Sequence, residues 1–168
     1  MRLDGSSSDQ VIAYVDASYG VHTNRKSHTG VVISIGNGPV FISSTKQRLV
    51  TKSSTEAELV GLSDALSQVL WTRHFMQAQG YPQKPALILQ DNESTIRQAT
   101  YGRSNQSRMR HVDIRYFFIK DRMVSGDCEV QYIPTKEMVA DMFTKPLQGE
   151  LFRAHRSRLM CESDSPSS

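Results

Sequence analysis

Two apolar runs separated by Gly36-Asn37-Gly38 predict a β-hairpin near the start of the chain. The runs are TGVVISI at 29–35 and PVFISS at 39–44. A third run, VIAYVD at 11–16, contains β-branched and aromatic residues and predicts a buried strand that ends at Asp16. The chain is therefore expected to begin with three strands, of which the hairpin pair is antiparallel.

One long helix and several shorter elements follow the hairpin. Hydroxyl residues before an apolar-periodic run predict a helix from about Ser54 to Gln79, closed by Gly80 and Pro82. The remaining elements, in order, are a strand at 86–90, helices at 92–100 and 111–124, a strand at 129–133, and a helix that Pro134-Thr135 opens and Pro146 stops. This order predicts an α/β fold with a mixed sheet and packed helices. The segment 151–160 is either a short amphipathic helix or a segment that waits for a partner.

The composition is that of one ordinary globular domain. The chain has 168 residues, of which 38% are hydrophobic and 22% charged. Residues 1–10 and 161–168 are polar and Ser-rich, so both are predicted to be loose tails around a domain at 11–160. Cys128 and Cys161 lack a paired-ligand spacing, which argues against a disulfide framework or a zinc site and favours a reducing compartment.

No stretch of the sequence has the character of a membrane or export segment. No apolar run approaches the ~20 residues of a membrane-spanning helix, and the first ten residues lack the apolar core of a signal peptide. The sequence thus predicts an intracellular protein without a membrane partner.

Glu56 and Glu58 lie two positions apart near the start of the long helix, so their side chains diverge by about 200°. Measured from Glu58, six apolar residues of the helix fall between roughly −20° and 120°; they are Leu59, Leu62, Ala65, Leu66, Val69 and Leu70. Glu58 lies within this arc, whereas Glu56 lies at about 160° and outside it. A carboxylate on the buried stripe is costly unless a charged group meets it.

Four acids stand out by position: Asp16 and Asp91 at strand ends, Glu58 on the helix stripe and Asp141 in the last helix. If they converge, their oxygen-only ligands suit Mg²⁺ or Mn²⁺ rather than zinc. Two such ions roughly 4 Å apart can activate water and stabilise the leaving oxygen in phosphodiester cleavage. A metal would also compensate the inward-facing Glu58.

Each acid also has a simpler interpretation when it is taken alone. Asp91 could cap the helix that follows it, and Asp16 could belong to a turn at the strand end. Glu58 could extend to solvent from the first helical turn. Asp141 lies off the apolar arc of its predicted helix and could be an exposed helix acid. Only the four acids together favour a metal site.

Basic residues are concentrated in the segment 97–125. It holds two acids and seven basic residues, namely Arg97, Arg103, Arg108, Arg110, Arg115, Lys120 and Arg122. This is either a phosphate-facing patch or a solvated helix and loop, because a net charge of +3 is too small to decide between them.

Seven phrases of the sequence resemble, in order, the ribonuclease H domain of copia-type LTR retrotransposon Pol polyproteins. They are YVDASYG (14–20), RKSHTG (25–30), SSTEAELVGL (53–62), LQDNEST (89–95), RHVDIRYFFIKD (110–121), YIPTKEMVAD (132–141) and MFTKPL (142–147). The resemblance runs from about Val11 to Leu159. It implies a ribonuclease H fold with a five-stranded mixed sheet, and a site of two Mg²⁺ ions held by Asp16, Glu58, Asp91 and Asp141. In such sites the fourth acid, here Asp141, is the most exposed.

The resemblance also implies a function. A domain of this family follows the reverse transcriptase of its polyprotein, cleaves the RNA strand of RNA–DNA hybrids, and works in a cytoplasmic retrotransposon particle. A non-catalytic or domesticated binding module with the same fold is the alternative. A DNA-joining transposase is a weaker one, because this chain lacks flanking DNA-binding domains.

Candidate contacts to the hybrid follow from the chemistry of its strands. Hydroxyl and amide groups near the acids suit the sugars and phosphates, namely Ser18, Thr55, Asn92 and Ser94, although Thr55 or its neighbour Ser54 also suits a helix cap. Basic groups suit the phosphates, namely Lys46, Arg48 and Lys52 with Arg108 and Arg110 of the basic segment.

One loop of the sequence lacks a residue that many relatives have. Cellular and retroviral members of the fold often carry a histidine in the loop before the last helix, whereas residues 134–137 here read Pro-Thr-Lys-Glu. His111 lies far upstream, and its role is left open.

Overall fold

The protein contains a five-stranded mixed sheet with the strand order β3-β2-β1-β4-β5. The computed structural model describes residues 9–101 and 110–161, without the side chains of 110–112. Strand β2 pairs antiparallel with both β1 and β3. Strand β4 pairs parallel with β1, and β5 pairs parallel with β4. The strands are Val11–Ser18 (β1), His28–Ile35 (β2), Gly38–Lys46 (β3), Ala86–Gln90 (β4) and Cys128–Tyr132 (β5). The predicted fold class and strand order along the chain are confirmed.

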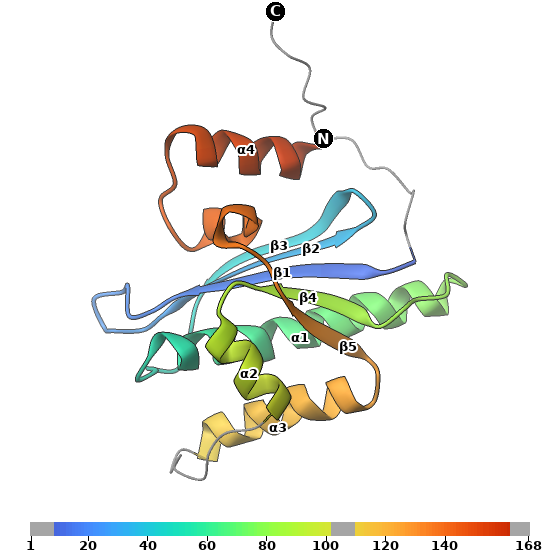
Figure 1. Ribbon diagram of the computed structural model, residues 1–168, viewed down its shortest axis with the longest axis horizontal. Coiled ribbons are helices and arrows are strands. Elements are labelled where there is room, and N and C mark those ends of the chain that lie inside the picture. Colours follow the sequence, from blue (N-terminus) through green and yellow to red (C-terminus); the bar gives the residue numbers. More distant parts are fainter. Residues whose placement is uncertain (1–8, 102–109, 162–168) are drawn as a thin grey trace, which may run out of the picture.

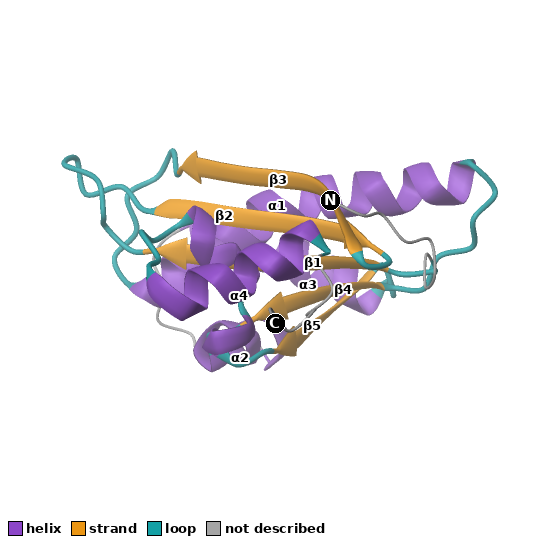
Figure 2. Ribbon diagram, turned by 90° about the horizontal axis from the view of Figure 1, so that it is seen from above, coloured by secondary structure: helices purple, strands orange, loops and turns teal. Residues whose placement is uncertain are grey.

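Helices cover both faces of the sheet (Figure 1). One face carries the helices Ser54–Ala78 (α1), Glu93–Tyr101 (α2) and Arg110–Val124 (α3). The other carries two short 3₁₀ turns, Thr135–Glu137 (η1) and Val139–Phe143 (η2), and the helix Gly149–Met160 (α4). Seen from above, α4 crosses over the sheet with α1 behind it (Figure 2).

Each face of the sheet has its own apolar core. On the α1 face, Leu59, Leu62 and Leu66 of the predicted stripe are fully buried against the sheet. On the opposite face, Met138, Val139 and Ala140 are buried beside Tyr14 and Val32. Each Å² of buried apolar area stabilises the fold by about 25 cal/mol, so these two cores are the main attachment of the helices and turns to the sheet.

The predicted helix after Pro134 is wrong. Residues Thr135–Phe143 form two 3₁₀ turns instead, and Met138, Val139 and Ala140 are buried. Tertiary contacts hold these turns to the sheet, because the Ala140 carbonyl packs closely on Gly30 and Ser44 donates to the Phe143 carbonyl. The segment 151–160 does form a helix, α4, and its Leu159 packs against the second core.

Hydrogen bonds attach the first described residues, Asp9 and Gln10, to the domain. The Lys84 amide donates to the Asp9 carbonyl, and Gln10 Nε2 donates to the Pro85 carbonyl at 2.9 Å. The predicted tails otherwise lie outside the described residues. Both cysteines are free thiols. In the described part of the chain, no helix has the length and apolar character needed to cross a membrane.

Gly30 on β2 allows the η2 turn to approach the sheet closely. A Cβ at this position would lie 2.6 Å from the Ala140 carbonyl oxygen and 2.9 Å from Thr144 Cγ2. Because backbone cannot yield as a flexible side chain does, Gly30→Ala is expected to cost about 1–3 kcal/mol of unfolding free energy. Urea denaturation in chelator measures this cost. The control is Gly61→Ala, whose Cβ would meet Thr29 side-chain atoms at 3.1 Å; equal stability of the two variants would contradict the expectation.

Candidate functional site

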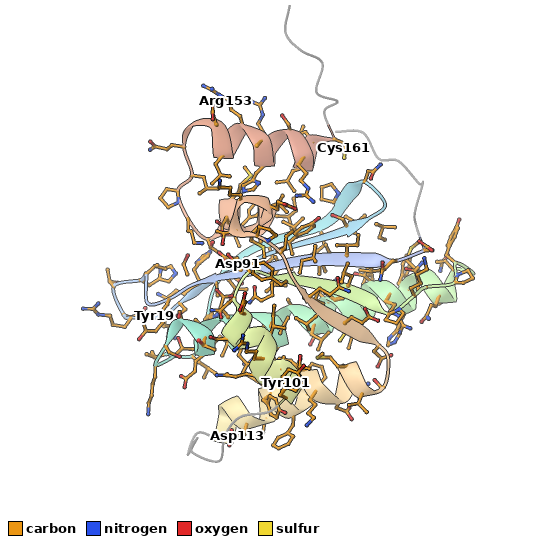
Figure 3. All side chains as sticks on the ribbon, in the orientation of Figure 1. Tyr19, Asp91, Tyr101, Asp113, Arg153 and Cys161 are labelled. Carbon is orange, nitrogen blue, oxygen red and sulfur yellow. The ribbon has the colours of Figure 1, made fainter. Side chains whose placement is uncertain are left out.

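Three of the four predicted acids meet at one edge of the sheet. Carboxylate oxygens of Asp16, Asp91 and Asp141 all lie within 4.8 Å of one another. Asp16 lies near the carboxyl end of β1, and Asp91 follows β4, the parallel neighbour of β1. Asp141 comes from η2, which packs over β1 and β2. Figure 3 shows Asp91 at the end of β4, where the sheet meets η2.

Glu58 approaches the same site from α1. Its side chain is buried, with 5% exposed, and Gln90 Nε2 donates to its Oε2 at 2.9 Å. Burial, and then the charge of Asp16, raise the pKa of Glu58 to about 8. The charge of Asp91 acts in the same direction. The four acids are thus electrostatically connected, and we call Asp16, Glu58, Asp91 and Asp141 the acidic site.

Each member of the acidic site accepts a hydrogen bond from a side-chain donor. Neutral groups serve three of them: Thr144 Oγ1 donates to Asp16, Gln90 to Glu58, and Thr135 Oγ1 to Asp91 at 2.8 Å. The fourth donor is charged, because Lys145 Nζ donates to Asp141 Oδ1 at 2.8 Å. Buried carboxylates without such partners would be strongly destabilising.

Burial dominates the electrostatics of Asp16. Burial raises its pKa, and the neighbouring Asp141 charge adds to this, whereas the Thr144 hydroxyl and the Lys145 ammonium lower it. The net direction is upward. Lys145 is the one charged group among the four hydrogen-bond donors described above, and a group of four acids with a single such partner is suited to cations.

The simpler interpretations of the individual acids do not describe the structure. Asp91 does not cap α2, because Asn92 Oδ1 accepts from the Thr95 amide at 3.1 Å in that position. Asp16 is not part of a turn, because β1 continues to Ser18 and pairs Asp16 with Gly30. Glu58 does not extend to solvent.

The expectation that Asp141 is the most exposed acid is wrong. Asp141 is 3% exposed, whereas Asp91 is half-buried and the most accessible of the four. The expectation came from the family resemblance, and the position of Asp141 off the apolar arc of a predicted α-helix agreed with it. The 3₁₀ turn rotates it inward instead, toward Lys145 and the sheet.

Glu56 has a structural role at the start of α1. Its backbone amide donates to the Ser53 side chain at 3.2 Å, and its Oε2 accepts from the Lys52 amide at 2.8 Å. Both bonds satisfy backbone donors at a helix N-terminus. Glu56 therefore lies apart from the acidic site, as its angle predicts, yet it is only 9% exposed because it caps the helix.

The predicted nucleic-acid contacts occupy varied positions. Ser18 is buried, and its hydroxyl donates to the Thr144 carbonyl at 3.0 Å. Lys46 and Arg48 line a cavity of about 470 Å³ together with Arg115. Lys52 and Ser94 are exposed, Thr55 is half-buried and Asn92 caps α2. Arg108 lies outside the described residues, and Arg110 begins α3 with its side chain, like that of His111, outside them too.

Several basic residues of the segment form ion pairs, mostly with acids outside it. Arg115 pairs with Asp64, and Arg122 pairs with Asp121 and Asp127. Arg97 lies 3.7 Å from Glu93. These pairs reduce the charge that the segment can offer to phosphates, so the count along the sequence overstates it.

Sequence reasoning assigned no role to the donors Gln90, Thr135, Thr144 and Lys145. Lys145 follows Asp141 by four positions, a spacing at which opposite charges pair. That spacing is the one local signal that could have identified Lys145. Thr135 and Thr144 reach acids 44 and 128 positions away, so only the fold brings them together.

The comparisons with known proteins agree with this geometry. The chain is 34% identical over 152 residues to the retrovirus-related Pol polyprotein from transposon RE1 of Arabidopsis thaliana, covering 88% of this chain and 10% of the relative. It is 32% identical over 142 residues to that from transposon TNT 1-94 of Nicotiana tabacum, covering 84% and 11%. The chain therefore spans about a tenth of these relatives. No family model matches it.

Two solved structures illustrate the similarity of the fold. LC11-RNase H1, isolated from compost, has a TM-score of 0.59 at 19% identity, with 80% of this chain and 92% of that chain covered. The native prototype foamy virus protease-reverse transcriptase has a TM-score of 0.57 at 16% identity, with 85% and 21% covered. The fold and the acidic site define a ribonuclease H-like domain.

The relatives place this domain within a larger family. The chain belongs with the ribonuclease H domains of Pol polyproteins from copia-type transposons.

Proposed function

We propose that this domain hydrolyses the RNA strand of RNA–DNA hybrids during retrotransposon reverse transcription, with divalent metal ions. The observation that carries the proposal is the convergence of three carboxyl groups within 4.8 Å, with the buried Glu58 behind them. The hybrid substrate is supported by the fold relative LC11-RNase H1, which has been solved in complex with an RNA/DNA hybrid.

The residues of the acidic site fit a hard divalent cation. The donors are carboxylate oxygens only, without cysteine or histidine among the clustered groups, and this is the donor set of Mg²⁺ or Mn²⁺. Burial is the main cause of the raised pKa values of Glu58 and Asp16, and repulsion from neighbouring carboxylates adds to it. A cation bound among these acids would favour their charged forms. Two Mg²⁺ ions held by Asp16, Glu58, Asp91 and Asp141 fit the proposal, with Mn²⁺ as the substitute.

Bound at this site, divalent ions supply the charge that activates an attacking water and stabilises the leaving oxygen of a phosphodiester. The protein's own groups position the site. Thr144 and Thr135 fix the carboxylates of Asp16 and Asp91, and Gln90 fixes that of Glu58. Thr135 lies in the loop where many relatives have a histidine, so here a hydroxyl, which does not titrate near neutral pH, contacts Asp91.

Partners follow from the same proposal. Lys46 and Arg48, which line the cavity together with Arg115, would contact phosphates without reading sequence. The reverse transcriptase domain of a Pol polyprotein would supply further contacts to the hybrid, because the chain spans about a tenth of its relatives. The intracellular location stays a prediction of the resemblance.

The test is cleavage of an RNA–DNA hybrid by the 168-residue chain, with label on either strand. We expect cuts in the RNA strand alone, in Mg²⁺ or Mn²⁺ and not in chelator, with activity that falls as salt rises. Adding the polymerase domain is expected to raise the rate at low enzyme concentration, and an unchanged rate would rule out that partner. Binding of the hybrid without cleavage in either metal would replace the proposal by a non-catalytic binding module.

A further inference from the structure

Lys145 is a cation held within the acidic site. Its Nζ lies 2.8 Å from Asp141 Oδ1 and 3.6 Å from Asp16 Oδ2. The two carboxyl groups are almost fully buried, with side-chain exposures of 4% and 3%, whereas the Lys145 side chain is 41% exposed. Among the described residues, no other lysine or arginine forms an ion pair with a member of the acidic site.

The backbone fixes where this ammonium can reach. The amides of Thr144 and Lys145 both donate to the Asp141 carbonyl, at 3.2 and 3.0 Å, so the chain turns back after η2. Ser18 and Ser44 hold this turn to the sheet by donating to the carbonyls of Thr144 and Phe143. The turn therefore keeps Lys145 beside the site, while its half-exposed side chain can rotate into solvent.

The ammonium and a divalent ion require the same oxygens. Lys145 Nζ donates to Asp141 Oδ1 and lies within ion-pair distance of Asp16 Oδ2. The three clustered acids offer their oxygens within 4.8 Å, and an ion bound among them would repel a cation at 2.8 Å from Asp141. The contact of Lys145 with the carboxylates must therefore weaken the binding of the divalent ion, and the bound ion must weaken that contact by the same factor.

We propose that Lys145 is a built-in counter-cation that stabilises Asp16 and Asp141 in the metal-free protein and must leave them when a divalent ion binds. This inference rests on the proposed metal-dependent function and adds a regulation of the same site. Lys145 acts through the carboxylates and is a positioning residue. It keeps the empty site folded at the expense of metal affinity, and it is released toward the substrate side when the site fills.

The test compares Lys145→Met and Lys145→Arg with the wild-type chain, with Lys136→Met as the matched control. Lys136 is an exposed lysine on the neighbouring turn η1 and, within the described residues, has no ion pair with the acidic site. Affinity is measured by calorimetry with MgCl₂ and by the electron paramagnetic resonance signal of free Mn²⁺. Melting temperature is measured in chelator and in saturating metal, and circular dichroism verifies folding.

Lys145→Met is expected to bind metal more tightly, on the order of tenfold, because one competing charge is removed. It is also expected to melt below the wild type in chelator and to recover in saturating metal. Lys145→Arg and Lys136→Met are expected to resemble the wild type in affinity. Unchanged or weaker binding by Lys145→Met, or a melting deficit that persists in metal, would overturn the inference and make Lys145 a structural anchor. Absence of metal binding by every variant would instead overturn the proposed function, and the inference with it.

Discussion

Replacing Glu58 with glutamine is expected to lower cleavage of the RNA strand by about a thousandfold or more. The amide keeps the size of the side chain and can still accept the hydrogen bond that Gln90 donates at 2.9 Å. It loses the negative charge that faces Asp16 and Asp91, and amide oxygens bind hard cations more weakly than carboxylates do. The assay is single-turnover cleavage of a labelled RNA–DNA hybrid in Mg²⁺.

Glu56→Gln is the matched control, because it makes the same chemical change two positions away. Glu56 accepts a hydrogen bond from the Lys52 amide, and an amide oxygen preserves that cap. We expect near wild-type cleavage and a loss of less than about 1 kcal/mol of unfolding free energy. Equal cleavage by the two variants, or loss of activity in Glu56→Gln alone, would refute the assignment of Glu58 to the acidic site.

The metal-free protein is expected to lose stability as pH rises from about 4.5 toward 8. Burial and the Asp16 charge raise the pKa of Glu58 from an ordinary 4.5 to about 8, so the folded chain retains a proton that the unfolded chain releases. Where the folded state binds more protons, the unfolding free energy falls with pH. One pKa unit corresponds to about 1.4 kcal/mol, so a loss of a few kcal/mol is expected. Asp16, whose pKa is also raised, adds to it.

Urea denaturation in chelator at several pH values measures this loss, and Glu58→Gln isolates the contribution of Glu58. The difference between wild type and variant removes the effects of other groups, among them His28 and His155, whose pKa values are lowered by burial. The variant is expected to be the more stable protein at pH 8 and to lose less stability between pH 5 and pH 8. A difference that does not change with pH would contradict the raised pKa.

These two predictions describe opposite effects of one side chain. Glu58 destabilises the metal-free fold at neutral pH, and it is required for the proposed reaction. Functional sites commonly retain such destabilising groups. Stability in chelator and activity in Mg²⁺ should therefore change in opposite directions when Glu58 is replaced.

The periodic spacing of apolar residues and the turn residues was sufficient to predict the long helix and the hairpin. The long helix begins at Ser54 as predicted and ends within one residue of the expected position, and the apolar arc that selects Glu58 is buried. The hairpin around Gly36-Asn37-Gly38 forms because positive φ is available at Gly36. These features depend on residues close together in the sequence.

The irregular segment that carries Asp141 could not be predicted in this way. Its turns depend on Gly30, which lets Ala140 approach β2, and on serine hydroxyls from two strands. None of these contacts leaves a local pattern. For the same reason the resemblance to a family supplied Asp141, whereas periodicity favoured an exposed acid.

The turn that brings Thr144 to Asp16 joins positions 128 residues apart. Contacts at such a separation form late when a chain is synthesised from its N-terminus, since the second partner must first be made. Until residues 141–145 dock, Asp16 lacks its hydroxyl donor and its nearby ammonium, and the acidic site lacks one of its acids. During synthesis the acidic site is thus incomplete until residues 141–145 have been translated, and the proposed cleavage could begin only after that point.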